Sequence, residues 1–131
     1  MDTEFIKTKI TQHSSRGRSV GGDFNLNPEM TRKTSNLVPA AVLIPLVLRK
    51  SGITLMFTRR TEALTNHPGQ ISFPGGHVDS KDNSPTEAAL RETKEEVGIG
   101  EKYINIIGSL DVYETRTGFS VLPIVGFICP P

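Results

Sequence analysis

The sequence has few of the features that mark secreted, membrane-bound or nucleic-acid-binding proteins. Its single cysteine, Cys129, excludes an internal disulfide framework and fits a reducing compartment. No run of basic residues is longer than two and the formal net charge is +1, so the charge pattern does not indicate nucleic-acid binding. The first residues lack the apolar core of a secretory signal, and their acidic side chains argue against a transit peptide.

Long hydrophobic runs are also missing. The longest, residues 37–48, contains Pro39 and Pro45, and it is too short to cross a bilayer but suits a buried strand. With 131 residues, the chain is long enough for one domain with a single core. We therefore expect a cytoplasmic protein with no membrane or nucleic-acid partner, and its oligomeric state stays open.

The N-terminal segment, residues 1–36, is mostly polar. A modest helical stripe in residues 3–13 predicts a short docking helix, with apolar residues at Phe5, Ile6 and Ile10. Residues 14–36 are polar and rich in glycine, so we expect a long loop there.

From residue 37 to residue 131 the sequence predicts one α/β domain. The strands that we expect span residues 38–49, 53–60, 70–73, 103–112 and 119–129. Pro45 implies a bulge or a gap in the ladder of the first strand. Gly75 and Gly76 follow Pro74 and mark a sharp turn where a ligand can approach the main chain.

A helix is well signalled between the third and fourth of these strands. Ser84 is the expected N-cap, Pro85 takes the first helical position and Glu87 completes a capping box. Gly98 is the expected C-cap. The side that should pack on the sheet carries Thr86, Ala89, Leu90, Thr93 and Val97.

Three glutamates crowd one face of this helix. Glu92, Glu95 and Glu96 fall at offsets of three and four residues and share an arc of about 100°. Like charges at this spacing repel each other, so a bare helix gains nothing from the arrangement. A bound divalent cation makes the arrangement favourable, because the hard ions Mg²⁺ and Mn²⁺ prefer carboxylate oxygens.

A solvated face on a surface helix is the alternative explanation of these glutamates. Three features favour the metal: the glycine pair upstream, Asp79 and Asp82 in the loop, and the basic Arg91 among the acids. Arg91 lies four residues from both Glu87 and Glu95 and can pair with either. Together these features are typical of a site for a metal-bound, phosphate-bearing substrate.

This stretch resembles the signature of the Nudix hydrolases, which reads Gly, five residues, Glu, seven residues, then Arg-Glu-apolar-x-Glu-Glu-x-Gly-apolar. The second half matches at Arg91, Glu92, Glu95, Glu96, Gly98 and Ile99, with Thr93 at the apolar position. The first half departs, because Asn83 occupies the position of the first Glu and Gly76 lies one residue too early. Asp79 or Asp82 is a candidate replacement for that Glu.

The longer loop resembles the coenzyme A pyrophosphatase branch of the family. That branch has a further signature upstream, which this chain matches at Thr58, Arg60, His67, Gly69, Phe73, Pro74, Gly75 and Gly76. Thr61 and Thr65 depart from it. The resemblance covers about residues 38–131 and implies an α/β/α sandwich with a mixed sheet.

The activity that the resemblance implies is Mg²⁺- or Mn²⁺-dependent hydrolysis of coenzyme A or its thioesters to 4′-phosphopantetheine and adenosine 3′,5′-bisphosphate. Two alternatives stay open: hydrolysis of another nucleoside diphosphate derivative, such as ADP-ribose or NADH, and an inactive binding module. Relatives continue beyond the position of Pro131 with another strand and a helix. We therefore expect a C-terminally incomplete domain with one face of the sheet left bare.

The resemblance also assigns roles to residues. Glu92 and Glu96 are the first candidates for metal ligands, Glu95 is a third ligand or positions water, and the Gly76 carbonyl adds a backbone ligand. Arg91 orients the carboxylates. The predicted substrate contacts are Arg60, His67, Gly69, Gly75 and Gly76. Taken alone, His67 fits a structural loop histidine and Arg60 a solvated strand edge, although arginine's planar fork suits phosphate.

Overall fold

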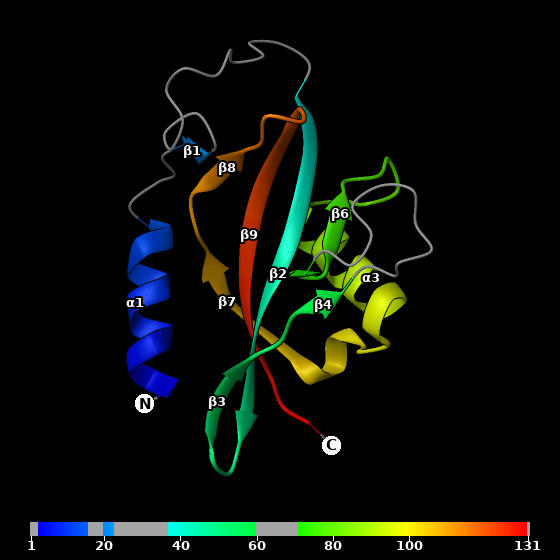
Figure 1. The fold of residues 1–131 in the computed structure, drawn as a ribbon. Coiled ribbons are helices and arrows are strands. Elements are labelled where there is room, and N and C mark those ends of the chain that lie inside the picture. Colours follow the sequence, from blue (N-terminus) through cyan, green and yellow to red (C-terminus); the bar gives the residue numbers. More distant parts are fainter. Residues whose placement is uncertain (1–2, 16–19, 23–36, 60–70, 131) are drawn as a thin grey trace.

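A computed structural model describes residues 3–15, 20–22, 37–59 and 71–130 of the chain (Figure 1). The helices in these ranges are α1 (Thr3–Ser15), α3 (Pro85–Val97) and the short 3₁₀ helix η1 (Glu101–Tyr103). The strands are β1 (Val20–Gly22), β2 (Val38–Arg49), β3 (Gly52–Leu55), β4 (Thr58–Arg59), β5 (Ile71–Ser72), β6 (Gly75–His77), β7 (Ile104–Ser109), β8 (Val112–Glu114) and β9 (Phe119–Ile128). None of the helices in the described ranges is long and apolar enough to cross a bilayer.

A mixed sheet forms the centre of the molecule. Its strand order is β1-β8-β9-β2-β3, and β6 also pairs with β2 while β7 pairs with β9. The two long strands β2 and β9 run parallel from the pair Val38 and Phe119 to the pair Val47 and Ile128 (Figure 1). A separate ladder joins β4 and β5.

Pro45 lies where one edge of β2 changes its partner. Residues 40–42 pair with β6, and residues 46–49 pair with β3. Leu43 donates its N–H to the carbonyl of Pro74 at 2.8 Å on this edge. Residues two apart in a strand direct their N–H groups to the same side. Another residue at position 45 would therefore direct its N–H to the same edge as Leu43, into the gap between β6 and β3, and proline has no N–H to place there. The ladder gap predicted at Pro45 is confirmed.

Each face of the sheet buries a hydrophobic cluster beneath one helix. Under α3 the cluster consists of Ala41, Leu43, Ala88, Ala89, Leu122 and Ile124. On the opposite face Ile6 and Ile10 of α1 pack against Ile107, Val125 and Phe127. Successive residues of β2 and β9 alternate between the two clusters, which explains why both strands are almost wholly apolar.

The two helices therefore enclose the sheet in an α/β/α arrangement (Figure 1). The expectation of a bare sheet face is corrected in part: α1 packs on the face opposite α3 over β7 and β9, while Ile44, Leu46 and Leu48 of β2 on that face are only half-buried. The predicted docking helix is confirmed, and it extends to Ser15.

Several predicted elements are interrupted. The strand expected at 53–60 breaks after Leu55, where the N–H of Met56 donates to the carbonyl of Pro45 at 3.2 Å. The strand expected at 103–112 divides into β7 and β8, with a register shift between Ile106 and Gly108. Within the loop expected at 14–36, residues 20–22 form β1 and pair in parallel with β8.

Candidate functional site

Helix α3, which carries most of the candidate residues, begins and ends as the sequence predicts. The hydroxyl of Ser84 accepts the N–H of Glu87 at 3.1 Å, and Pro85 is the first helical residue. At the other end Gly98 has φ 76° and donates its N–H to the carbonyl of Lys94. That left-handed conformation favours glycine, so both caps follow from local residue chemistry.

The face that α3 buries is centred on small residues. Ala88, Ala89 and Thr93 are fully buried. The predicted stripe omits Ala88, and it includes three residues that are only half-buried: Thr86, Leu90 and Val97. The buried hydroxyl of Thr93 donates to the carbonyl of Ala89 at 2.7 Å, so a polar residue is accommodated at the signature's apolar position.

Gly75 and Gly76 form a strand and not the predicted turn. The chain bends at Pro74, and β6 then pairs antiparallel with residues 40–42 of β2. A Cβ atom added at Gly75 would lie 2.3 Å from the carbonyl oxygen of Ala41. A Cβ atom added at Gly76 would lie 2.8 Å from the carboxylate carbon of Glu92. Glycine at Gly76 therefore brings the main chain directly against the carboxylate of Glu92.

Arg91 connects the loop before α3 to the glutamates on the helix. Its Nε and Nη2 donate to the two carboxylate oxygens of Asp82, each at 3.0 Å. Its Nη1 donates to Glu92 Oε1 at 2.9 Å and lies 3.3 Å from Glu95 Oε2. Nη2 also lies 3.4 Å from the carbonyl of His77. The predicted pairing with Glu95 is present, and the two shorter pairings connect Arg91 to Asp82 and Glu92.

Asp82 is the buried member of the two loop aspartates. Its side chain is 2% exposed, whereas that of Asp79 is 45% exposed and lies 3.5 Å from Arg91. The N–H of Asp79 donates to Asp82 Oδ2 at 2.9 Å, and the N–H of Asp82 donates back to the carbonyl of Asp79 at 3.0 Å. Hydrogen bonds from Arg91 and then from the Asp79 amide hold the pKa of Asp82 below its usual range. The Asp82 carboxylate, followed by that of Glu92, raises the pKa of Arg91.

The three glutamates differ in exposure. The side chain of Glu92 is 19% exposed, that of Glu95 is 60% exposed, and Glu96 is also exposed. Within the described residues no three acidic, histidine or cysteine side chains are grouped to hold a metal ion. The donor chemistry nevertheless fits a hard divalent cation, because oxygen ligands on Glu92 lie beside the main chain of Gly76. The full ligand set stays a prediction.

The remaining substrate contacts that the sequence predicts lie outside the described residues. Arg60, His67 and Gly69 all belong to the interval 60–70. The described residues on either side of that interval, Arg59 and Ile71, pair across β4 and β5.

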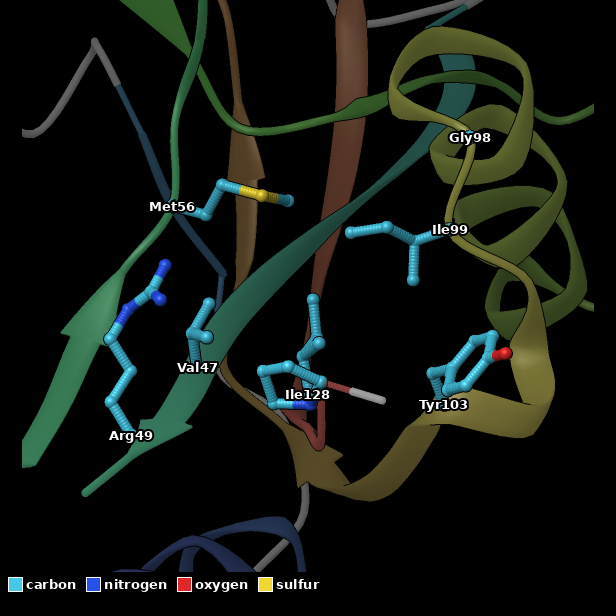
Figure 2. A pocket seen from close by; sticks show the side chains of 8 residues that line it. Val47, Arg49, Met56, Gly98, Ile99, Tyr103 and Ile128 are labelled. Atoms are coloured by element: carbon cyan, nitrogen blue, oxygen red, sulfur yellow. The ribbon is translucent and has the colours of Figure 1, made fainter.

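A cavity that the sequence does not predict opens beyond the C-terminal end of α3 (Figure 2). Its volume is about 380 Å³, and its lining residues are Val47, Arg49, Met56, Gly98, Ile99, Tyr103, Ile128 and Pro130. Figure 2 shows Met56 and Ile99 pointing toward one another across it. None of the predicted site residues in the described ranges lines this cavity. Its walls come from β2, the segment after β3, the segment after α3 and the end of β9, and no local sequence pattern brings these together.

Comparison with known proteins identifies the family. Residues 37–127 match the NUDIX domain, and the chain therefore belongs to the Nudix family. A curated relative from Enterobacter sp. (strain 638), named uncharacterized Nudix hydrolase NudL, is 50% identical over 105 residues. A protein of the same name from Salmonella dublin is also 50% identical over 105 residues. Each alignment covers 80% of this chain and 54% of the relative, so the chain spans about half the length of these relatives.

Solved Nudix structures share the fold. RenU, a Nudix hydrolase from M. smegmatis, superposes with a TM-score of 0.58 at 18% identity over 72% of this chain and 63% of that chain. The Ap4A hydrolase of C. elegans gives a TM-score of 0.56 at 28% identity over 72% of this chain and 70% of that chain. The NUDIX domain of Shewanella oneidensis NrtR, complexed with ADP ribose, gives 0.52 at 14% identity over 82% and 69%. The predicted mixed α/β Nudix fold is confirmed.

Proposed function

We propose that this chain is the Nudix domain of a divalent-metal-dependent hydrolase that cleaves the diphosphate linkage of coenzyme A or its thioesters. The products are 4′-phosphopantetheine and adenosine 3′,5′-bisphosphate. The observation that carries the proposal is the position of the Glu92 carboxylate, which Arg91 holds beside the main chain of Gly76. The preference for coenzyme A rests on the matches to the branch signature between Thr58 and Gly76.

Residues of β6 and α3 have different roles in the proposed site. Glu92, Glu95, Glu96 and the Gly76 carbonyl would hold Mg²⁺ or Mn²⁺, which when bound supplies the positive charge that a diphosphate needs and activates water. Arg91 acts as an orienting group, because its Nη1 fixes the carboxylate of Glu92. Its Nε and Nη2 are already bonded to Asp82, so Arg91 does not face the substrate with its fork.

Substrate contacts are proposed for residues near β4, β5 and β6. Arg60 binds a phosphate oxygen pair through its planar guanidinium, and His67 and Gly69 contact the substrate beside it. Gly75 and Gly76 are proposed to contact the diphosphate through main-chain atoms, since the side of Gly75 where a Cβ would lie faces Ala41 and that of Gly76 faces Glu92.

A second candidate is hydrolysis of another nucleoside diphosphate derivative. The C. elegans neighbour is an Ap4A hydrolase at 28% identity, which favours including a dinucleoside polyphosphate among the substrates tested. ADP-ribose and NADH belong in the same comparison. A binding module without activity is the rival from a different class, and a complete lack of turnover would favour it.

The glutamate cluster is tested with Glu96→Gln, which keeps the size of the side chain and removes its charge. Coenzyme A hydrolysis is measured with Mg²⁺ and with Mn²⁺ for both proteins, and Glu87→Gln on the same helix is the matched control. We expect Glu96→Gln to lower the rate by about 10²-fold and Glu87→Gln to leave it within about twofold. Equal rates for wild type and Glu96→Gln would remove Glu96 from the mechanism.

A further inference from the structure

We propose that the cavity beyond the C-terminal end of α3 binds the acyl group of a coenzyme A thioester. This assignment rests on the proposed function and extends it to a part of the substrate that free coenzyme A lacks. Among the described residues, those that we assign to metal and phosphate contacts all lie outside the cavity lining. The acyl group needs a site of its own, and the cavity supplies an apolar one.

The walls of the cavity run from a buried floor to an exposed rim. Val47 of β2 and Ile128 of β9 form the floor and are 5% and 3% exposed. Met56 and Ile99 are half-buried and point toward one another across the cavity (Figure 2). Pro130 is exposed at the rim. A chain that enters therefore meets aliphatic surface on the floor and on both sides, and each methylene that it inserts adds affinity.

The size of the cavity suits a short or medium acyl chain. Gly98 contributes no side chain to the space, and no atom lies within 4 Å of a Cβ atom added there. The volume of about 380 Å³ is near the lower end of the range of about 300–1,000 Å³ that is usual for small-molecule pockets. The unbranched side chain of Met56 can adjust its rotamer to chains of different shape.

The polar groups of the lining do not provide a charged partner inside the cavity. Among the described residues that line it, Arg49 alone is charged, and it is exposed at the rim. Its Nε donates to Thr54 Oγ1 of β3 at 3.2 Å. Figure 2 shows the hydroxyl of Tyr103 pointing away from Met56. A carboxylate or phosphate would lose its hydration on the apolar floor without gaining a partner, whereas an aliphatic chain gains by leaving water.

The position of the cavity on α3 determines which end of the thioester reaches it. The C-terminal end of a helix carries a partial negative charge, which disfavours a phosphate beside Gly98. The diphosphate therefore stays with the metal site at Glu92 and Gly76, and the uncharged end of the substrate extends to the cavity. Gly98 lies six residues after Glu92, or about 9 Å along the helix axis. An extended pantetheine arm is longer than this, so one molecule can occupy both places.

The test compares hexanoyl-coenzyme A with free coenzyme A, as ligands in calorimetric titrations without metal and as substrates with Mg²⁺. Met56→Trp fills the cavity, and Leu55→Trp is the matched control, because Leu55 is 49% exposed and does not line it. We expect wild type and Leu55→Trp to bind hexanoyl-coenzyme A about tenfold more tightly than coenzyme A. Met56→Trp should lose this preference and bind free coenzyme A within about twofold of wild type.

Two results would overturn the assignment. One is equal affinity of the wild type for the two ligands, since the cavity would then gain nothing from the acyl chain. The other is a Met56→Trp variant that keeps the preference or that loses affinity for both ligands equally. Equal loss would mean that the cavity holds a part of coenzyme A that both ligands share.

A variant that widens the cavity keeps the test decisive where Met56→Trp fails to fold. Met56→Ala should raise the affinity for decanoyl-coenzyme A relative to hexanoyl-coenzyme A by about threefold or more, because the longer chain gains room. Partial unfolding cannot produce such a gain for the longer ligand. An unchanged ratio of the two affinities in Met56→Ala contradicts the assignment.

The outcome for the proposed function is separate. If the wild type hydrolyses neither substrate but binds hexanoyl-coenzyme A more tightly, and Met56→Trp abolishes this preference, the proposed hydrolysis fails and the acyl site stands. If the wild type hydrolyses both substrates with equal kcat/KM and Met56→Trp leaves that ratio and the affinities unchanged, the acyl site fails and the proposed function stands.

Discussion

Gly75 and Gly76 are adjacent residues with different reasons to lack a side chain. Gly75 lies against the backbone of β2, where a Cβ atom would be 2.3 Å from the carbonyl oxygen of Ala41. Gly76 lies against the flexible end of Glu92, where a Cβ atom would be 2.8 Å from the carboxylate carbon. A rigid strand cannot move away from an added methyl group, whereas a side chain can.

Alanine should therefore mainly affect stability at position 75 and mainly affect metal binding at position 76. Gly75→Ala should lower the free energy of unfolding by about 1–3 kcal/mol, because the β2–β6 pairing must shift. Gly76→Ala should change the free energy of unfolding little but weaken Mn²⁺ binding by about tenfold, because it displaces Glu92. Urea unfolding and Mn²⁺ titration of both variants measure this. Wild-type Mn²⁺ affinity in Gly76→Ala would exclude Glu92 and Gly76 as a shared site.

Asp82 should make stability depend on pH in the acid range. Its pKa lies below the ordinary value of 3.8, mainly because of the hydrogen bonds from Arg91. The folded state thus binds fewer protons than the unfolded state, so the contribution of Asp82 is complete above about pH 5 and is lost as the pH falls through the lowered pKa. The difference in free energy of unfolding between wild type and Asp82→Asn should shrink between about pH 5 and pH 2. A difference that stays constant over this range would contradict the ion pair.

At the scale of elements, α1 is attached to β7 by specific contacts as well as by Ile6 and Ile10. The hydroxyl of Ser14 accepts the N–H of Ser109 at 2.9 Å. Gly108 lies directly below this end of the helix, where a Cβ atom would be 2.6 Å from Ser14 Oγ and 2.7 Å from Ile10 Cγ2. The close approach of α1 to the sheet therefore depends on Gly108.

Gly108→Ala should displace α1 from the sheet. Gly52→Ala is the matched control, because Gly52 has a comparable positive φ of 137°, against 153° at Gly108, but no atom lies within 4 Å of its added Cβ. Both variants carry the backbone strain of about 1–2 kcal/mol, and only Gly108→Ala should add faster hydrogen exchange in the amides of α1. Equal exchange in the two variants would show that the helix tolerates the extra methyl group.

The whole molecule shows which features a sequence can predict. The ends of α3 are determined by residues inside the helix or next to it, such as Ser84 and Gly98, so the local sequence is enough to predict them. The long strand at 38–49 can also be predicted, because its almost wholly apolar composition indicates packing on both faces. By contrast, β6 is a strand because it pairs with β2, more than thirty residues earlier in the chain. A local reading of Gly75 and Gly76 predicts a turn.

In the candidate site, too, local spacing predicts some contacts and contacts between distant segments determine the others. Spacing alone places Glu92, Glu95 and Glu96 on one face and allows Arg91 to meet Glu95. The choice between Asp79 and Asp82 depends on how the loop folds back over the helix, and no spacing rule determines it. The packing of α1 against β7 and β9 on the second face of the sheet is likewise a contact between distant segments.

The most direct test of the central claim compares substrates for the purified 131-residue chain. Coenzyme A, ADP-ribose, NADH and Ap4A are each incubated with Mg²⁺ or Mn²⁺, and the products are separated and identified by mass. We predict the highest kcat/KM for coenzyme A, with 4′-phosphopantetheine and adenosine 3′,5′-bisphosphate as the two products. Faster turnover of another diphosphate would contradict the assignment to coenzyme A, and intact substrates in every reaction would contradict the enzyme itself.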